Sequence, residues 1–246
     1  YFEEDFPHQN TLREFVSDQE MFEKIIELYE KNKVENHNVF LFGVTMQNHG
    51  GYDYEGADYQ QTISLNGYTQ EYSDAEQYLS MIHATDSAVK YLLDYFSKAD
   101  HEVVVVFYGD HLPSLNSNFY QEVHGGTFDT IEEQQLKHRV PFFIWANYDI
   151  PEETVDQVSL NYLSNYVYRA AGFELPSYNR YLDDLQKTIP EVNSVGYYSR
   201  TEQCFLTYSE AQREERDALH QYQCLMYNSL FDHRNRNAQL FPTAAD

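Results

Sequence analysis

A run of apolar residues ends directly before a carboxylate and an imidazole in the stretch Val103–Leu112, VVVVFYGDHL. Residues 103–107 are all β-branched or aromatic, which is typical of a strand covered on both faces, and such strands are mostly central members of parallel sheets. In an open α/β sheet, ligands bind in the crevice beyond the carboxyl ends of the strands. The stretch therefore predicts a buried strand that delivers Asp110 and His111 to a site.

The side chains of Asp110 and His111 suit a metal ion. Asp supplies a hard oxygen ligand and neutral His a nitrogen ligand, and the two together suit Zn²⁺, Mn²⁺ or a similar divalent ion. The alternative is an Asp that caps the turn, with a solvated His beside it. The dipeptide alone leaves both interpretations open.

The charge balance excludes one class of function. Lys and Arg number 16 against 40 Asp and Glu, which gives a formal net charge of −24 over 246 residues. Such a surface repels nucleic acid phosphates and anionic lipid headgroups, so the chain is not a general nucleic-acid binder. An anionic substrate would need local positive charge, which a bound cation supplies.

A second apolar strand is predicted at residues 37–44, HNVFLFGV, and it leads into a loop in which His49 precedes two glycines. Glycines let a backbone approach a ligand closely, which makes His49 a candidate binding residue. The alternative is a plain Gly-Gly turn with an exposed His.

The apolar spacing from about Tyr72 to Lys98 predicts a long helix between the two strands. Strand, helix and parallel strand make a βαβ unit, which is right-handed in nearly all proteins. His49 and the Asp110–His111 pair would then emerge at the same edge of the sheet.

Other segments follow helical or strand periodicity. Helices are predicted over about 18–33, 130–138, 159–171, 178–188 and in a polar tail from 209, strands over 140–145 and 193–199, and a loop over 113–126. The two cysteines, Cys204 and Cys224, are too few for a disulfide framework and leave a single bridge as an option.

The chain starts in mid-pattern with Tyr1 and has no initiator Met. Its apolar runs are far shorter than the ~20 residues of a membrane helix, and it has no signal peptide. We therefore expect it to be a piece of a longer protein.

The motifs occur in an order that resembles a known family. TMQNHGGY follows the first strand and YGDHLP the second, and then come HRVPFFIWANYD and a tail reading YQCLMYNSLFDHRNR. Over nearly its whole length the chain is similar to the sulfatase-like domain of the lipoteichoic acid synthase and phosphoglycerol transferase family, in the alkaline phosphatase superfamily. The resemblance implies a three-layer α/β/α fold with a mostly parallel central sheet, its N-terminal part missing here. Residues 1–200 would be the C-terminal portion of the catalytic domain, and 201–246 a helical tail packing on it.

The resemblance also implies an activity. Family members are bacterial membrane enzymes, anchored by helices absent here, with an extracellular catalytic domain. They take glycerol phosphate from phosphatidylglycerol, the lipid partner, and pass it to a cell-envelope polymer or glycan acceptor. The reaction runs through a phosphorylated Thr beside a divalent metal, which is commonly Mn²⁺, with Zn²⁺ and Mg²⁺ as alternatives.

Four residues match the family's functional positions. Asp110 and His111 match its paired metal ligands, and His49 matches the His that contacts the phosphoglycerol group. Ser114 is an approximate match to a serine that meets the substrate. The nucleophilic Thr and a further acidic ligand would precede Tyr1, so the segment alone is predicted to be inactive.

Two other functions stay open. One is a non-catalytic sulfatase-like module that binds or assembles. The other is a different enzyme of the superfamily, such as a sulfatase or a phosphoethanolamine transferase. The latter usually carries several disulfides, and two cysteines argue weakly against it.

Overall fold

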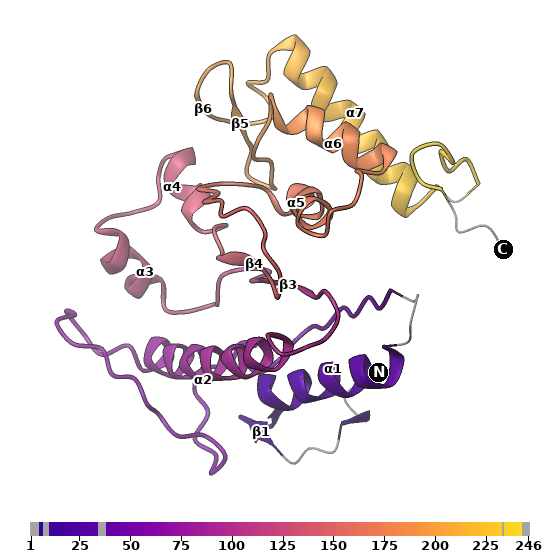
Figure 1. Cartoon of the computed structure of the whole chain (residues 1–246). Coiled ribbons are helices and arrows are strands. Elements are labelled where there is room, and N and C mark those ends of the chain that lie inside the picture. The colour runs from indigo at the N-terminus through magenta and orange to yellow at the C-terminus, as the bar shows by residue number, and fades with distance from the viewer. Residues whose placement is uncertain (1–4, 7–9, 34–37, 233, 243–246) are drawn as a thin grey trace. The chain divides into compact units, whose positions relative to one another are not determined.

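The structure is a computed structural model that describes residues 5–6, 10–33, 38–232 and 234–242 (Figure 1). The chain divides into two compact units. Unit 1 consists of residues 1–103 and 113–127, and unit 2 consists of residues 104–112 and 128–246. None of the helices in the described ranges has the length and apolar character needed to cross a membrane.

Unit 1 is built on two helices that pack against each other, α1 (Asp18–Asn32) and α2 (Ser73–Phe96) (Figure 1). A short antiparallel hairpin, β1 (Thr11–Leu12) and β2 (Phe15–Val16), precedes them. The hairpin lies within residues 1–18, which are polar and acidic and follow no helix or strand period. The sequence therefore did not predict this hairpin.

The predicted ends of α1 and α2 are confirmed to within two residues. Ser17 caps α1, because its side chain accepts a hydrogen bond from the Glu20 N–H at 3.2 Å. The buried ring of Tyr29 meets that of Phe96 edge-on, with centroids 5.1 Å apart. The apolar stripes predicted from helical spacing are therefore the surfaces that join the two helices.

The predicted strand at 37–44 is wrong for its described part, because residues 38–44 form no strand. This segment still alternates: Gly43 lies so close to α1 that a Cβ there would be 2.7 Å from Met21 Cε, whereas Phe40 is 87% exposed. A strand needs a hydrogen-bonded neighbour, and an apolar pattern does not supply one. His37 lies outside the described residues.

Unit 2 contains the strand that the sequence predicts most strongly, β3 (Val104–Tyr108). It pairs with β4 (Phe142–Ala146) in register, with Val106 opposite Ile144, and the pair is antiparallel. The predicted strand β4 is confirmed. The parallel βαβ unit is not confirmed, because residues 38–44 form no strand and every strand pair among the described residues is antiparallel. Apolar composition indicates a covered strand but does not set the direction of its neighbour.

The remainder of unit 2 is mostly helical. Its elements are α4 (Ile131–Leu136), η2 (Leu160–Tyr162), α5 (Leu163–Ala170), α6 (Ser177–Gln186), β5 (Tyr197–Ser199), β6 (Cys204–Leu206) and α7 (Arg213–Leu230). Its core cluster joins these elements and consists of Tyr162, Leu182, Leu185, Ile189, Tyr197, Ala211 and Tyr222. Tyr222 of α7 thus packs with residues from before position 200. The division into 1–200 and 201–246 stays a prediction.

Two further expectations are settled by the structure. The predicted loop 113–126 is wrong, because it contains α3 (Ser117–His124). Asn116 caps this helix, because its side chain accepts a hydrogen bond from the Asn118 N–H at 2.9 Å. This cap was not predicted, because the composition of the segment is typical of a loop. Cys204 and Cys224 are both free thiols.

Candidate active site

Asp110 and His111 follow β3 through one glycine. The Gly109 N–H donates to the Pro141 carbonyl at 3.1 Å, so the pairing of β3 with the chain before β4 continues to this residue. A Cβ on Gly109 would lie 3.1 Å from Val140 Cβ, which is tighter than most side-chain contacts. The neighbouring segment therefore favours glycine here, and the two polar side chains come directly after it.

The side chains of Asp110 and His111 are arranged as two ligands of one ion could be. His111 Nδ1 lies 2.8 Å from the Leu112 carbonyl oxygen, so Nδ1 carries the proton and Nε2 keeps its lone pair. Nε2 lies 3.7 Å from Asp110 Oδ1. Two ligand atoms that are each ~2.1 Å from a tetrahedral ion lie ~3.4 Å apart. The pair is thus close to the spacing that a shared divalent ion requires.

The same pair is incomplete as a metal site. Across the described ranges, no cluster of three or more His, Cys, Asp or Glu side chains could hold an ion. Catalytic zinc sites take three protein ligands and keep one position open. Asp110 and His111 therefore fit part of a metal site.

His49 lies in the loop between residues 45 and 52 of unit 1. Its N–H donates to the Met46 carbonyl at 2.9 Å, which closes a turn. Its exposed ring meets Phe15 edge-on with centroids 6.1 Å apart, and its ring nitrogens bond to no described residue. The imidazole is therefore available to a ligand.

The residues just before His49 are anchored on α2. The amides of Gln47 and Asn48 both donate to Thr85 Oγ1, at 3.1 and 2.8 Å. The Thr85 hydroxyl in turn donates to Asp18 Oδ2 at 2.6 Å. The Asp18 N–H donates to Gln47 Oε1 at 3.0 Å, so these four residues form one network.

Asp18 is a buried carboxylate within this network. Its Oδ1 has no hydrogen-bond partner among the described residues. Burial raises the pKa of Asp18, and the hydrogen bond from Thr85 opposes this rise. Burial beside the His49 loop thus disfavours the charged form of Asp18.

Arg13 also binds the backbone of the His49 loop. Its guanidinium donates to the carbonyls of His49, Gly50 and Gly51, at 3.2, 3.3 and 2.5 Å. The guanidinium also lies over the Tyr52 ring, 5.2 Å from its centroid.

Ser114 is exposed and belongs to the segment that follows the Asp110–His111 pair. This segment belongs to unit 1 and packs on α2, because the Asn116 N–H donates to Asp74 Oδ2 at 2.6 Å and Tyr120 lies near Tyr78. Tyr78 also meets Tyr52 edge-on at 5.6 Å. Burial, followed by the electrostatic effect of Tyr78, raises the pKa of Tyr52 to about 12, so this phenol stays protonated and donates to the Asn48 carbonyl at 2.9 Å.

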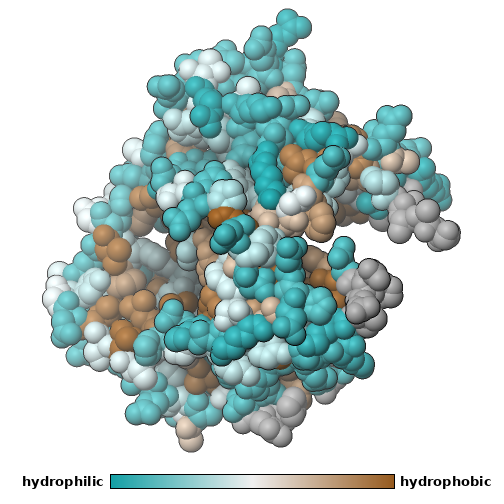
Figure 2. Space-filling model, viewed as in Figure 1, coloured by the Kyte–Doolittle hydropathy of each residue, from teal (hydrophilic) through white to brown (hydrophobic). Residues whose placement is uncertain are grey.

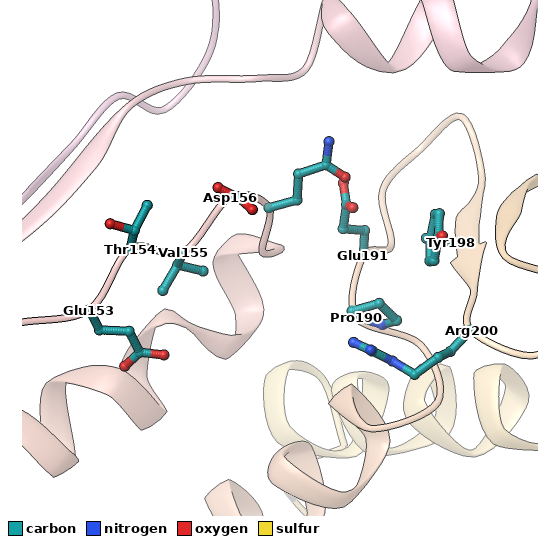
Figure 3. Close-up of a pocket in the computed structure, with 9 residues that line it drawn as sticks. Glu153, Thr154, Val155, Asp156, Pro190, Glu191, Tyr198 and Arg200 are labelled. Atoms are coloured by element: carbon teal, nitrogen blue, oxygen red, sulfur yellow. The ribbon is translucent and has the colours of Figure 1, made fainter.

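A cleft of about 480 Å³ in unit 2 holds none of the four predicted site residues (Figure 3). Three carboxylates line it against one guanidinium, and these are Glu153, Asp156, Glu191 and Arg200. An excess of negative charge disfavours a phosphate there. In the view of Figure 2, hydrophilic residues cover most of the visible surface of the molecule, in line with the negative net charge of the chain.

The structure places His49 and Ser114 in unit 1, and Asp110 and His111 in unit 2. The common sheet edge expected for His49, Asp110 and His111 stays a prediction. Sequence analysis missed the support of the His49 loop by Arg13 and Thr85. Neither residue has a local signal, because each acts on a segment more than 35 positions away.

Comparison with known proteins bears on this arrangement. The Sulfatase family model matches residues 1–173, which is more than half of the chain. This match confirms the predicted resemblance to sulfatase-like domains.

Two relatives come from Rhizobium meliloti (strain 1021). One, named for cyclic beta-1,2-glucan modification, is 29% identical over 189 residues, which are 73% of this chain and 29% of the relative. The other, capsular polysaccharide biosynthesis protein RkpI, is 31% identical over 103 residues, which are 42% of this chain and 17% of that protein. The chain thus spans less than a third of either relative.

A solved structure has a similar fold. It is Streptococcus pyogenes phosphoglycerol transferase GacH in complex with sn-glycerol-1-phosphate. The TM-score is 0.65 at 18% identity, and the match covers 91% of this chain and 51% of GacH. The likeness shows the fold, a mixed α/β arrangement of the sulfatase type.

Proposed function

This chain belongs to the sulfatase family, and from that premise we propose that it is the C-terminal part of a metal-dependent phosphoglycerol transferase. The complete protein would move glycerol phosphate from phosphatidylglycerol to a cell-envelope polymer or glycan. Its domain would have three α/β/α layers around a mostly parallel sheet, to which this chain contributes one portion.

The geometry of Asp110 and His111 is the observation that carries this proposal. The atoms Nε2 and Oδ1 lie 3.7 Å apart, and His111 Nδ1 is engaged by a backbone carbonyl. Such an outer hydrogen bond orients a ligating His and sets its tautomer. A divalent ion, Mn²⁺ first and Zn²⁺ or Mg²⁺ as alternatives, would supply positive charge for the phosphate oxygens and for the attacking hydroxyl.

The proposed transfer has two steps. A Thr oxygen outside this chain attacks phosphorus and gives up its proton, the bond from phosphorus to the diacylglycerol oxygen breaks, and that oxygen takes a proton. The oxygen of an acceptor hydroxyl then attacks the same phosphorus, the bond from phosphorus to the Thr oxygen breaks, and the Thr oxygen takes back a proton as the acceptor loses one. His49 would hydrogen-bond the phosphoglycerol group, and Ser114 would lie against the substrate.

The names of the similar proteins support an envelope substrate. They refer to a glucan, to a capsular polysaccharide and to sn-glycerol-1-phosphate. We infer that the complete protein lies in the bacterial membrane, anchored outside these residues, with this domain on the extracellular side.

The decisive experiment measures transfer by the full-length protein that contains this segment. The assay follows release of diacylglycerol from phosphatidylglycerol with Mn²⁺ added after chelation. We expect Asp110→Asn and His111→Gln each to lower the rate at least ~100-fold, since each removes a metal ligand. Asp86→Asn, on the exposed surface of α2, is the charge-matched control and should keep the wild-type rate.

Other outcomes would decide between the alternatives. Hydrolysis of a sulfate ester without transfer of glycerol phosphate would identify a sulfatase. Tight binding of a glycan without turnover would identify a non-catalytic module. The isolated 246-residue chain is expected to show no turnover, and metal-dependent release of glycerol phosphate by it would contradict the assignment of the nucleophile.

A further inference from the structure

We propose that Arg13 is a positioning residue that sets the conformation of the His49 loop. This inference rests on the proposed function of His49 as a contact of the phosphoglycerol group. Arg13 does not need to touch the substrate for this role. It acts through the backbone of the residue that would.

Three hydrogen bonds of Arg13 converge on one short stretch of backbone, and Nη1 also donates to Met81 Sδ of α2 at 2.8 Å. Nη1 donates to the His49 carbonyl, and Nη2 donates to the Gly50 and Gly51 carbonyls. Three consecutive carbonyl oxygens therefore face the same guanidinium. This fixes the direction of the chain at residue 49, while the imidazole of that residue is exposed.

The neighbours of Arg13 contact the same loop. Phe15 lies under the guanidinium, 6.0 Å from it, and its ring also meets the His49 imidazole. Tyr52 is stacked by the guanidinium and donates to the Asn48 carbonyl. Arg13 is thus the centre of a cluster that reaches the loop through both backbone and rings.

Arg13 is held in an unfavourable backbone conformation. It and Glu14 form the two-residue turn between β1 and β2, with φ values of 54° and 68°. Asn and Gly are the residues that normally take such positions in a two-residue hairpin. Side chains with a Cβ are disfavoured there, and residues kept in such conformations cluster at functional sites.

Arg13 is a buried charge. The residue is only 4% exposed, and no carboxylate among the described residues forms an ion pair with it. Its Nε has no hydrogen-bond partner within the described part of the chain. Burying a charge that lacks a paired ion is costly, and an apolar side chain of similar volume often stabilises such a position. A role in the core alone would therefore be better served by Met than by Arg.

Hydrogen exchange on the full-length protein tests the proposal. We expect Arg13→Met to keep the fold, with unchanged protection of α1 and α2, and to speed amide exchange in residues 46–52 about 10-fold or more. Arg13→Lys retains a donor but not the fork, so its effect should be intermediate. Lys31→Met, on the exposed end of α1, removes a matched charge and should leave the loop unchanged.

Kinetics give the second readout. Arg13→Met should raise KM for the phosphoglycerol donor about 10-fold and change kcat less, with partial rescue in Arg13→Lys. Unchanged exchange of residues 46–52, or faster exchange with unchanged KM, would overturn the proposal. If Arg13→Met does not fold, the same two measurements on Arg13→Lys decide. If the wild-type protein shows no transferase activity but the variants still speed amide exchange in residues 46–52, the proposed function is contradicted. The positioning of the loop by Arg13 is not contradicted by that outcome.

Discussion

The His49 loop of unit 1 is held by hydrogen bonds from three other segments, namely the Arg13 side chain in the β1–β2 turn, the Asp18 N–H at the start of α1 and the Thr85 side chain in the middle of α2. In unit 2, Asp110 and His111 are bonded, among the described residues, only to each other and to Leu112. Their side chains are 76% and 71% exposed.

The difference follows from what each region would bind. A side chain that contacts a substrate directly must be oriented before the substrate arrives, and buried hydrogen bonds provide that orientation. Metal ligands are drawn together by the ion itself, and binding of the ion adds to the stability of the folded state. The first region is therefore prepared by the protein, and the second would be completed by the ion.

The largest expected effect on stability comes from removing the anchor of the His49 loop. Thr85→Val removes the acceptor that the Gln47 and Asn48 amides share and the hydroxyl that donates to Asp18, and it leaves Gln47 Nε2 only its longer contacts with the Met81 carbonyl and Asn48 Oδ1. Because each unsatisfied buried group costs about 1–3 kcal/mol, we expect the free energy of unfolding to fall by ~3 kcal/mol in urea titrations.

The control for this substitution is Thr62→Val, at an exposed position of unit 1. It should change the free energy of unfolding by no more than ~0.5 kcal/mol. If Thr85→Val also changes the free energy of unfolding by less than ~1 kcal/mol, the hydrogen-bond network does not anchor the His49 loop. The contrast between the two regions then disappears.

A smaller effect is expected from the buried carboxylate. Burial raises the pKa of Asp18, so the folded state binds a proton that the unfolded state releases. The free energy of unfolding then falls as the pH rises through the raised pKa, and the stability is recovered below it. Asp18→Asn removes this slope and should gain stability relative to the wild type between acidic and neutral pH. Urea midpoints at several pH values measure this difference, and a constant difference would count against it.

The smallest effect is expected at Asp110 and His111, the proposed metal ligands. Without metal, Asp110→Asn and His111→Gln should each change the free energy of unfolding by no more than ~0.5 kcal/mol, because both side chains are exposed. Mn²⁺ should raise the thermal midpoint of the full-length wild type and leave both variants unchanged. A large loss of stability without metal would show that this pair is structural.

Local signals predicted the helices well. The cap at Ser17 and the apolar stripe of α1 belong to one continuous segment, as does the stripe of α2, so neighbouring residues carry all the information. β3 and the polar pair after it were found for the same reason.

Partners distant in the sequence were not predictable. The residues 38–44 carry the pattern of a strand but form none, and β3 pairs antiparallel with β4. The pattern reports which side chains are apolar, whereas the ladder depends on which chain lies alongside and in which direction. The parallel sheet therefore stays a prediction for the complete domain.

By itself, the sequence determined the ends of α1 and α2, the strand before Asp110 and His111, and the sulfatase-type motif order, since each is a property of contiguous residues. Only the tertiary structure decided that Arg13 and Thr85 hold the His49 loop, over separations of 36 and 37 positions. The physical reason is that contacts between a buried guanidinium and three carbonyls leave no periodic pattern or motif in the sequence. It exists only once the hairpin, the loop and α2 have been packed together.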